Sequence, residues 1–219
     1  MSKWLKDWYP DVTAVGGLAA AMSEAATLRG CDIGRVSPTP DGVTTETTRG
    51  FVSVGLAAEE RLFRVNVSIP DFAWSIGSTD DLGLLVEAVA AWREGAPYDE
   101  LRARFEFLEL DEFTRALERG EPTSSQWSAL LSSDFYKGQR NLLRRIHADE
   151  TLRGFFPTIS HGAVRLRVEP LDGASRQLLV AELEGERYEV LRAGVPGPTW
   201  VEVPAGDLID HLRAALNRP

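Results

Sequence analysis

The hydrophobic pattern changes period along the chain, and this change is the strongest constraint on the fold. In RLFRVNVSI (61–69) every second residue is apolar, which is typical of a strand with one buried face. In STDDLGLLVEAVAAWREG (78–95) the apolar residues recur every three or four positions, as in an amphipathic helix. Helical patterns continue to about Gly154, and alternation returns in AVRLRV (163–168). The chain therefore has two strand regions separated by a helical region.

The flanking segments complete this plan. A helix is predicted over 14–29 and another in PAGDLIDHLRAALNRP at the end of the chain. Further strands are predicted in IGRVSP, GVTTETT, GFVSVGLAA, RQLLVAELEG, ERYEVLRA and TWVEV. The predicted fold is α+β, with two antiparallel meanders, each closed by an amphipathic helix, and a helical segment between them. The predicted boundaries are 1–95 for an N-terminal α+β unit, 96–154 for the helical segment and 155–219 for a C-terminal α+β unit, all forming one compact assembly.

Composition and charge limit the classes of function. The chain has 219 residues, of which 43% are hydrophobic, but charges interrupt its apolar runs well before the roughly 20 residues of a membrane-spanning helix. The first residues, MSKWLKDWYPD, contain no apolar signal region. We therefore expect a soluble, cytoplasmic protein with no membrane partner. The net charge of -9 and the lack of a nucleic-acid-binding motif also argue against a nucleic-acid partner.

The sequence lacks the residue patterns that are typical of metal and cofactor sites. Cys31 is the only cysteine, so an intramolecular disulfide and a cysteine-based zinc cluster are both excluded. No HExxH or HxH spacing is present, and the pair Gly16-Gly17 lacks the glycine spacing of a nucleotide-binding loop. We expect no metal and no cofactor.

One basic segment interrupts an otherwise acidic chain. Residues 136–168 contain 7 Lys and Arg against 2 Asp and Glu, whereas 81–135 contain 5 against 12. On a helix, Arg140, Arg144 and Arg145 would lie outside the apolar face. Such a segment can simply be a solvated helix surface, or it can bind an anionic partner. These three arginines are candidate ligand-binding residues.

The stretch FFPTISHG (155–162) is the other candidate site. His161 can act as an acid or base near neutral pH, or it can order a corner by donating to a backbone carbonyl. Pro157 favours extended backbone before the next strand, and an extended backbone would place Ser160 and His161 on opposite faces, which excludes a hydrogen bond between them. If the protein is an enzyme, His161 is the candidate acid or base, and Arg144, Arg145 or Arg165 would hold an anionic substrate.

Several motifs together resemble a known protein family. YPDVTAVGGLAAAMSEAA, STDDLGLLVEAVAAWREGAP, QWSALL and above all LRGFFPTISHGAVRLRV are similar to an actinobacterial family of unknown function labelled "natural product biosynthesis protein". The Pro-x-x-Ser-His-Gly block at 157–162 is the most specific part of this resemblance. The resemblance implies an association with a bacterial natural-product gene cluster, and it implies no reaction and no catalytic residues.

These observations favour binding over catalysis. The sequence predicts a non-catalytic binding or accessory protein that holds a protein, a peptide or an anionic metabolite, with Arg140, Arg144, Arg145, Arg165 and His161 as candidate contacts. Two alternatives stay open. One is a small-molecule biosynthetic enzyme that uses His161, and the other is an immunity-type inhibitor whose acidic surface neutralises a basic toxin.

Overall fold

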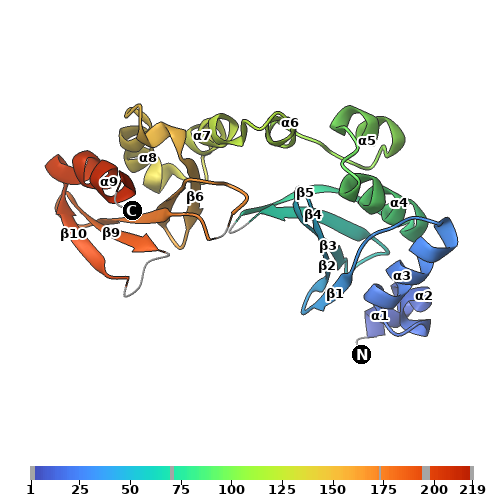
Figure 1. Ribbon diagram of the computed structural model, residues 1–219. Helices are drawn as coiled ribbons and strands as arrows, with labels where there is room; N and C mark the ends of the chain where they lie inside the picture. The colour runs from blue at the N-terminus through green and yellow to red at the C-terminus, as the bar shows by residue number, and fades with distance from the viewer. Residues whose placement is uncertain (1–2, 70–71, 173, 194–197, 218–219) are drawn as a thin grey trace. The chain divides into compact units, whose positions relative to one another are not determined.

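The computed structural model describes residues 3–69, 72–172, 174–193 and 198–217 (Figure 1). The chain divides into two compact units, Met1–Arg115 (unit 1) and Ala116–Pro219 (unit 2). Each unit contains a five-stranded antiparallel sheet, and the strands follow one another in sequence order in both sheets. The predicted α+β class, with two antiparallel meanders, is therefore confirmed. No helix in the described part of the chain is long and apolar enough to cross a membrane.

Unit 1 consists of helices, a meander and further helices (Figure 1). The helices before the sheet are α1 (Lys3–Trp8), α2 (Pro10–Ala14) and α3 (Leu18–Arg29). The strands are β1 (Val36–Thr39), β2 (Gly42–Thr47), β3 (Gly50–Leu56), β4 (Phe63–Ile69) and β5 (Phe72–Thr79). The helices α4 (Leu82–Arg93) and α5 (Tyr98–Arg104) follow, and α6 (Glu112–Glu118) contains the division between the units.

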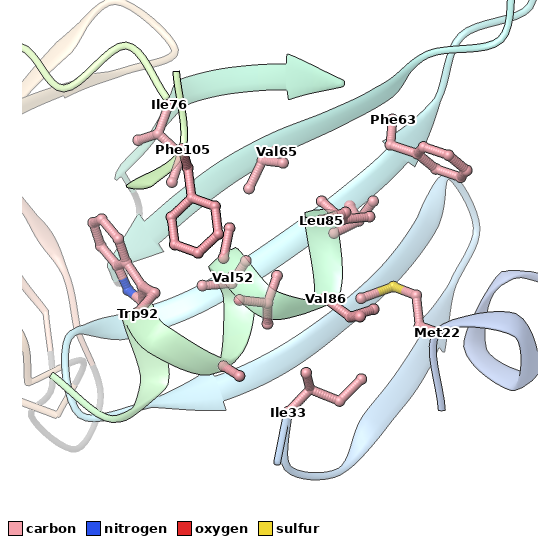
Figure 2. Packing of buried hydrophobic residues seen from close by; sticks show 14 of the residues in the cluster. Met22, Ile33, Val52, Phe63, Val65, Ile76, Leu85, Val86, Trp92 and Phe105 are labelled. Carbon is pink, nitrogen blue, oxygen red and sulfur yellow. The ribbon is translucent and has the colours of Figure 1, made fainter. Parts of the chain in front are cut away.

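The core of unit 1 lies between its sheet and helix α4. The alternation in β4 places Phe63, Val65 and Val67 in this core, as predicted. Figure 2 shows Leu85 and Trp92 of α4 packed among side chains of the strands. Helices thus cover one face of the sheet, and short polar side chains dominate the other.

The predicted helix over 14–29 is interrupted. The structure has α2 and α3 instead, because Gly16 and Gly17 adopt positive φ angles of 98° and 122° between them, a region that side chains with a Cβ rarely occupy. Helix α4 begins later than the predicted segment 78–95, at Leu82, because Ser78 and Thr79 end strand β5. Its N-cap is Asp81, whose carboxylate accepts a 2.9 Å hydrogen bond from the Leu84 amide.

Strand β5 was not predicted from the sequence, although its Phe72, Trp74 and Ile76 alternate with small residues. It lies at the edge of the sheet, where later residues of the chain partly cover it. The Glu109 amide donates to the Ile76 carbonyl at 2.7 Å, and Leu108 forms a β-bridge with Gly77. This bridge satisfies part of the edge that would otherwise be open to another chain.

Unit 2 repeats the plan of helices, meander and closing helix (Figure 1). Its first helices are α7 (Pro122–Ser132), η1 (Lys137–Gln139), α8 (Arg140–His147) and η2 (Leu152–Gly154). The strands are β6 (Phe156–Ser160), β7 (Ala163–Arg167), β8 (Gln177–Leu183), β9 (Arg187–Ala193) and β10 (Trp200–Pro204). The short η3 (Ala205–Asp207) leads into the closing helix α9 (Leu208–Asn217). Leu143, Ile146, Val164, Leu208 and Leu212 belong to the core of this unit.

The segment after Pro157 corrects one of the sequence predictions. Residues 158–162 were expected to be an extended lead-in, but β6 pairs with β7 and only His161 and Gly162 connect the two strands. His161 has a φ of 51° and Gly162 a φ of 82°, as in a two-residue hairpin turn of the primed type. Because the backbone turns here, Ser160 Oγ and His161 Nδ1 lie 3.0 Å apart. The predicted exclusion of this hydrogen bond is therefore wrong.

A buried carboxylate joins the helical part of unit 2 to its closing helix. The side chain of Asp149 is 5% exposed, accepts hydrogen bonds from the Leu152 and Thr151 amides at 2.9 and 3.1 Å, and forms an ion pair with Arg213 of α9. The hydrogen bond from Arg213, together with these amides, holds the pKa of the Asp149 carboxyl below its usual range, although burial opposes the change.

This arrangement predicts a pH-dependent contribution of Asp149 to stability. Because its pKa is lowered by folding, the contribution is complete above the unfolded value of about 4 and is lost as the pH falls through the folded value. We expect Asp149→Asn to lower the free energy of unfolding by about 1 kcal/mol near pH 7, because the neutral amide loses the ion pair with the half-exposed Arg213, and by less as the pH approaches 3. Urea denaturation at both pH values measures this difference. Asp210→Asn is the matched control, since Asp210 contacts the same arginine with 85% of its side chain exposed, and an equal loss at both pH values would contradict the account.

Candidate functional site

His161, the candidate acid or base, lies at the tip of the β6–β7 hairpin. Its side chain is exposed, and its contact is with the hydroxyl of the neighbouring Ser160. The interpretation in which His161 orders a corner by donating to a backbone carbonyl does not match this exposed turn. His161 lines none of the four cavities described below.

The candidate arginines, three of which lie on α8, do not converge on any of these cavities. Arg140 donates to the Ser133 carbonyl at 2.8 Å, and Arg145 donates to the Ala205 carbonyl, so both hold neighbouring segments of unit 2. Arg144 is exposed on α8, and Arg165 is partly buried on β7. None of these arginines lines one of the four cavities, so the structure does not assemble the predicted candidates into a site.

The largest of the four cavities lies in unit 1, at the end of the sheet where β2 and β3 meet. Its volume is about 790 Å³, within the range of small-molecule sites. We call it the β2–β3 cavity. Its lining comes from the α3–β1 connection, from β1 to β3 and from the last turn of α4. The polar side chains that line it belong to Arg35, Ser37, Thr44, Glu46, Thr47, Thr48 and Arg93.

Asp32 fixes one wall of the β2–β3 cavity. Its carboxylate accepts from the Gly34 amide at 2.8 Å and from the Arg93 guanidinium at 2.6 Å. Gly34 has a φ of 69°, and a Cβ at this position would lie 2.7 Å from Arg93 Nε. The backbone at Gly34 can therefore pass beside the Arg93 side chain only because Gly34 has no side chain. One oxygen of the carboxylate and a close backbone contact thus orient Arg93.

Arg49 holds the tip of the β2–β3 hairpin, whose Thr47 and Thr48 form another wall of the cavity. Its guanidinium donates to the Gly95 and Ala96 carbonyls, just after the end of α4, at 2.6 and 2.9 Å. It also lies over the rings of Tyr98 and Trp92, 4.7 and 5.7 Å from their centroids, a cation–π geometry. These contacts tie the hairpin tip to the helix layer, so the cavity has two fixed walls.

Two charged side chains in this cavity are available to a ligand. No hydrogen bond or ion pair joins the side chain of Arg35 or of Glu46 to another residue in the described part of the chain, and both side chains are exposed. Phe51 adds an aromatic ring that is 42% exposed. Arg35 and Arg93 supply donors that match a carboxylate or a phosphate, and the hydroxyls around them can donate or accept.

The other cavities are less suited to recognition. A cavity of about 650 Å³ in unit 2 is lined by His147, whose ring centroid lies 5.1 Å from that of Trp127. Glu150 and Arg153 also line it, and they already form an ion pair with each other at 3.4 Å. A cavity of about 620 Å³ beside β5 is mainly acidic, with Glu106, Glu109 and Asp111. The fourth, of about 10 Å³, is an apolar gap beneath α4. The cavity beside β5 also contains an exposed arginine, Arg102, but three carboxylates accompany it. Among the four cavities, only the β2–β3 cavity has more arginines than carboxylates in its lining.

The groups of unit 1 whose pKa values are shifted take part in structural contacts. Arg61 donates to both carboxylate oxygens of Asp11 at 2.8 Å, and this hydrogen bonding holds the pKa of the Asp11 carboxyl below its usual range. Burial raises the pKa of the Cys31 thiol, and the nearby Glu87 acts in the same direction, so the thiol is not activated for nucleophilic attack. Within the described ranges, no group of three or more His, Cys, Asp or Glu side chains could hold a metal ion.

The residues of the β2–β3 cavity were not predicted from the sequence. Arg35 belongs to the predicted strand segment IGRVSP, and Glu46 to the predicted strand segment GVTTETT, so each looked like an ordinary exposed position. One signal was present, because Phe51, near the start of β3, is an apolar residue on the face opposite Val52 and Val54.

Comparisons of the chain with protein-family models, with curated proteins and with solved structures give no match. The resemblance to the natural-product family therefore stays a prediction.

Proposed function

We propose that the protein is a non-catalytic binding protein that holds an anionic metabolite or peptide in the β2–β3 cavity of unit 1. The observation that carries this proposal is the pairing of an oriented guanidinium, Arg93, with an unpaired one, Arg35, in a cavity of about 790 Å³. An accessory role in a natural-product gene cluster, which the sequence resemblance implies, belongs to the same proposal.

Physical chemistry favours a carboxylate as the group that is bound. Arg93 already shares one of its nitrogens with Asp32, so its positive charge is partly compensated, and Arg35 provides the additional charge that one carboxylate needs. A planar guanidinium can donate two parallel hydrogen bonds to a carboxylate. The Phe51 ring beside them can pack against an apolar group of the ligand. An aromatic monocarboxylate is therefore a suitable probe.

The proposal predicts that Arg35→Ala weakens binding of 3-phenylpropanoate by about 10-fold to 100-fold, since a hydrogen bond to a charged group contributes about 1.5–3 kcal/mol. Titration followed by ¹⁵N NMR measures the affinity and also shows which amides respond. In the wild-type protein the largest changes should occur within residues 34–51.

Arg64→Ala is the matched control. Arg64 is an exposed arginine of the same sheet, paired in register with Gly55, and it does not line the cavity. The control should bind like the wild type. Equal affinities of the wild-type protein and Arg35→Ala, or shifts confined to residues outside unit 1, would sink the proposal.

A further inference from the structure

The carboxylate of Glu46 restricts the kind of ligand that the β2–β3 cavity can bind. This side chain lines the β2–β3 cavity together with Arg35 and Arg93. It has no ion-pair partner within the described part of the chain. A ligand that is only anionic, such as inorganic phosphate, would gain from the two arginines and would be repelled by Glu46. A ligand with both charges would satisfy all three groups.

We propose that the ligand is a short peptide with free ends, whose C-terminal carboxylate binds Arg35 and Arg93 and whose N-terminal ammonium binds Glu46. This inference rests on the proposed function, because it assigns the charged groups of a ligand held in the same cavity. Capture of free peptide termini by charged side chains and backbone groups is a general mode of recognition.

The size and lining of the cavity favour a peptide over a single amino acid. A volume of about 790 Å³ suits a ligand of drug-like size, which corresponds to two or three residues. The hydroxyls of Ser37 and Thr48 line the cavity and make no hydrogen bond within the described part of the chain. Peptide amides and carbonyls are suitable partners for them. Phe51, which is 42% exposed, can pack on one apolar side chain of the peptide.

The hydroxyls that already have partners can also take part. Thr44 Oγ1 donates to the Val52 carbonyl at 3.3 Å, and Thr47 Oγ1 donates to the Gly50 carbonyl at 2.6 Å. Each oxygen keeps a lone pair that can accept from a peptide N–H. The cavity therefore offers donors and acceptors between its cationic and anionic groups, as a zwitterionic peptide requires.

The test compares Ala-Phe-Ala, with free ends, against the same tripeptide acetylated at its N-terminus. Calorimetric titration of the full chain should show that acetylation weakens binding by about 10-fold, which is the loss of one charge-assisted hydrogen bond. Glu46→Gln should weaken binding of the free tripeptide by about the same factor and leave the acetylated tripeptide unchanged. The near-isosteric Gln keeps the fold, and a circular dichroism spectrum like that of the wild type checks this.

The outcomes separate this inference from the proposed function. If both tripeptides bind with equal affinity, and Glu46→Gln changes the affinity of neither, the inference is overturned. In that case, loss of binding of both tripeptides in the Arg35→Ala variant would still support carboxylate binding. If neither tripeptide binds but 3-phenylpropanoate does, the inference is likewise overturned and the proposed function stands. If no carboxylate binds, both fail.

Discussion

Replacing Trp92 by alanine is expected to lower the free energy of unfolding of unit 1 by about 3–5 kcal/mol, which is the range for deleting a large aromatic side chain from a packed core. Trp92 lies among the core side chains of unit 1 (Figure 2). It is 1% exposed and stacks on Tyr98 with ring centroids 5.2 Å apart. Alanine would leave a cavity next to Val65 and Ile76, which already border a small apolar gap with Trp92. Urea denaturation followed by circular dichroism measures the change.

Phe135→Ala is the control for this substitution. Phe135 is also an aromatic residue, but it is 87% exposed, so its removal should change the free energy of unfolding by no more than about 0.5 kcal/mol. A loss below about 1 kcal/mol for Trp92→Ala would mean that the packing of α4 on the sheet is not as described.

Replacing Arg49 by alanine is expected to lower the free energy of unfolding of unit 1 by about 2 kcal/mol. The substitution removes both hydrogen bonds to the Gly95 and Ala96 carbonyls, and hydrogen bonds to charged groups contribute about 1.5–3 kcal/mol. It also removes the cation that lies over the Tyr98 ring. Thermal or urea denaturation gives the stability, and the ligand titration gives a second readout.

The ligand titration shows whether Arg49 supports a wall of the cavity or only stabilises the fold. Arg49 does not line the β2–β3 cavity, but it holds the hairpin tip that contributes Thr47 and Thr48. Arg49→Ala should therefore also weaken ligand binding, whereas Arg49→Lys, which keeps the charge and one donor to the carbonyls, should lie between the wild type and the alanine variant in both measurements. Full stability in Arg49→Ala would show that the hairpin tip is held by other contacts.

The sequence predicted the fold where the pattern is carried by side-chain spacing. The alternation in β4 and β7, and the helical spacing in α4 and α9, each place one apolar face in a core, and burial of that face makes the pattern necessary. These features are local, and for that reason a single sequence shows them.

The strands that were missed are both at sheet edges. Strand β6 contains Pro157, which argues against a strand in the middle of a sheet, but the order β10-β9-β8-β7-β6 puts it at an edge, where a missing N–H is tolerated. Strand β5 contains Gly77 and pairs with β4 through a register shift between Val65 and Asn66, so its alternation is interrupted. In both cases the segment forms a strand because of its position at the edge of the sheet, and that position is not evident from the sequence.

The candidate site depended on tertiary position throughout. Arg35, Glu46 and Arg93 come from a connection, a strand and a helix end, and no spacing rule links them. His161 and the arginines of α8 were chosen as candidates because their charge and residue types are evident from the sequence. Residue type alone, however, does not predict which side chains lie close together in the fold. The His161 turn shows the same point, since the positive φ of 51° that allows its contact with Ser160 depends on the pairing of β6 with β7.

The central claim is that the β2–β3 cavity binds a carboxylate, and a crystal structure of the protein grown with Ala-Phe-Ala tests it most directly. We expect electron density for the peptide in this cavity, with its carboxylate oxygens within about 3 Å of a guanidinium nitrogen of Arg35 or Arg93. Density for the peptide elsewhere on the molecule, with the β2–β3 cavity filled by solvent alone, would contradict the claim.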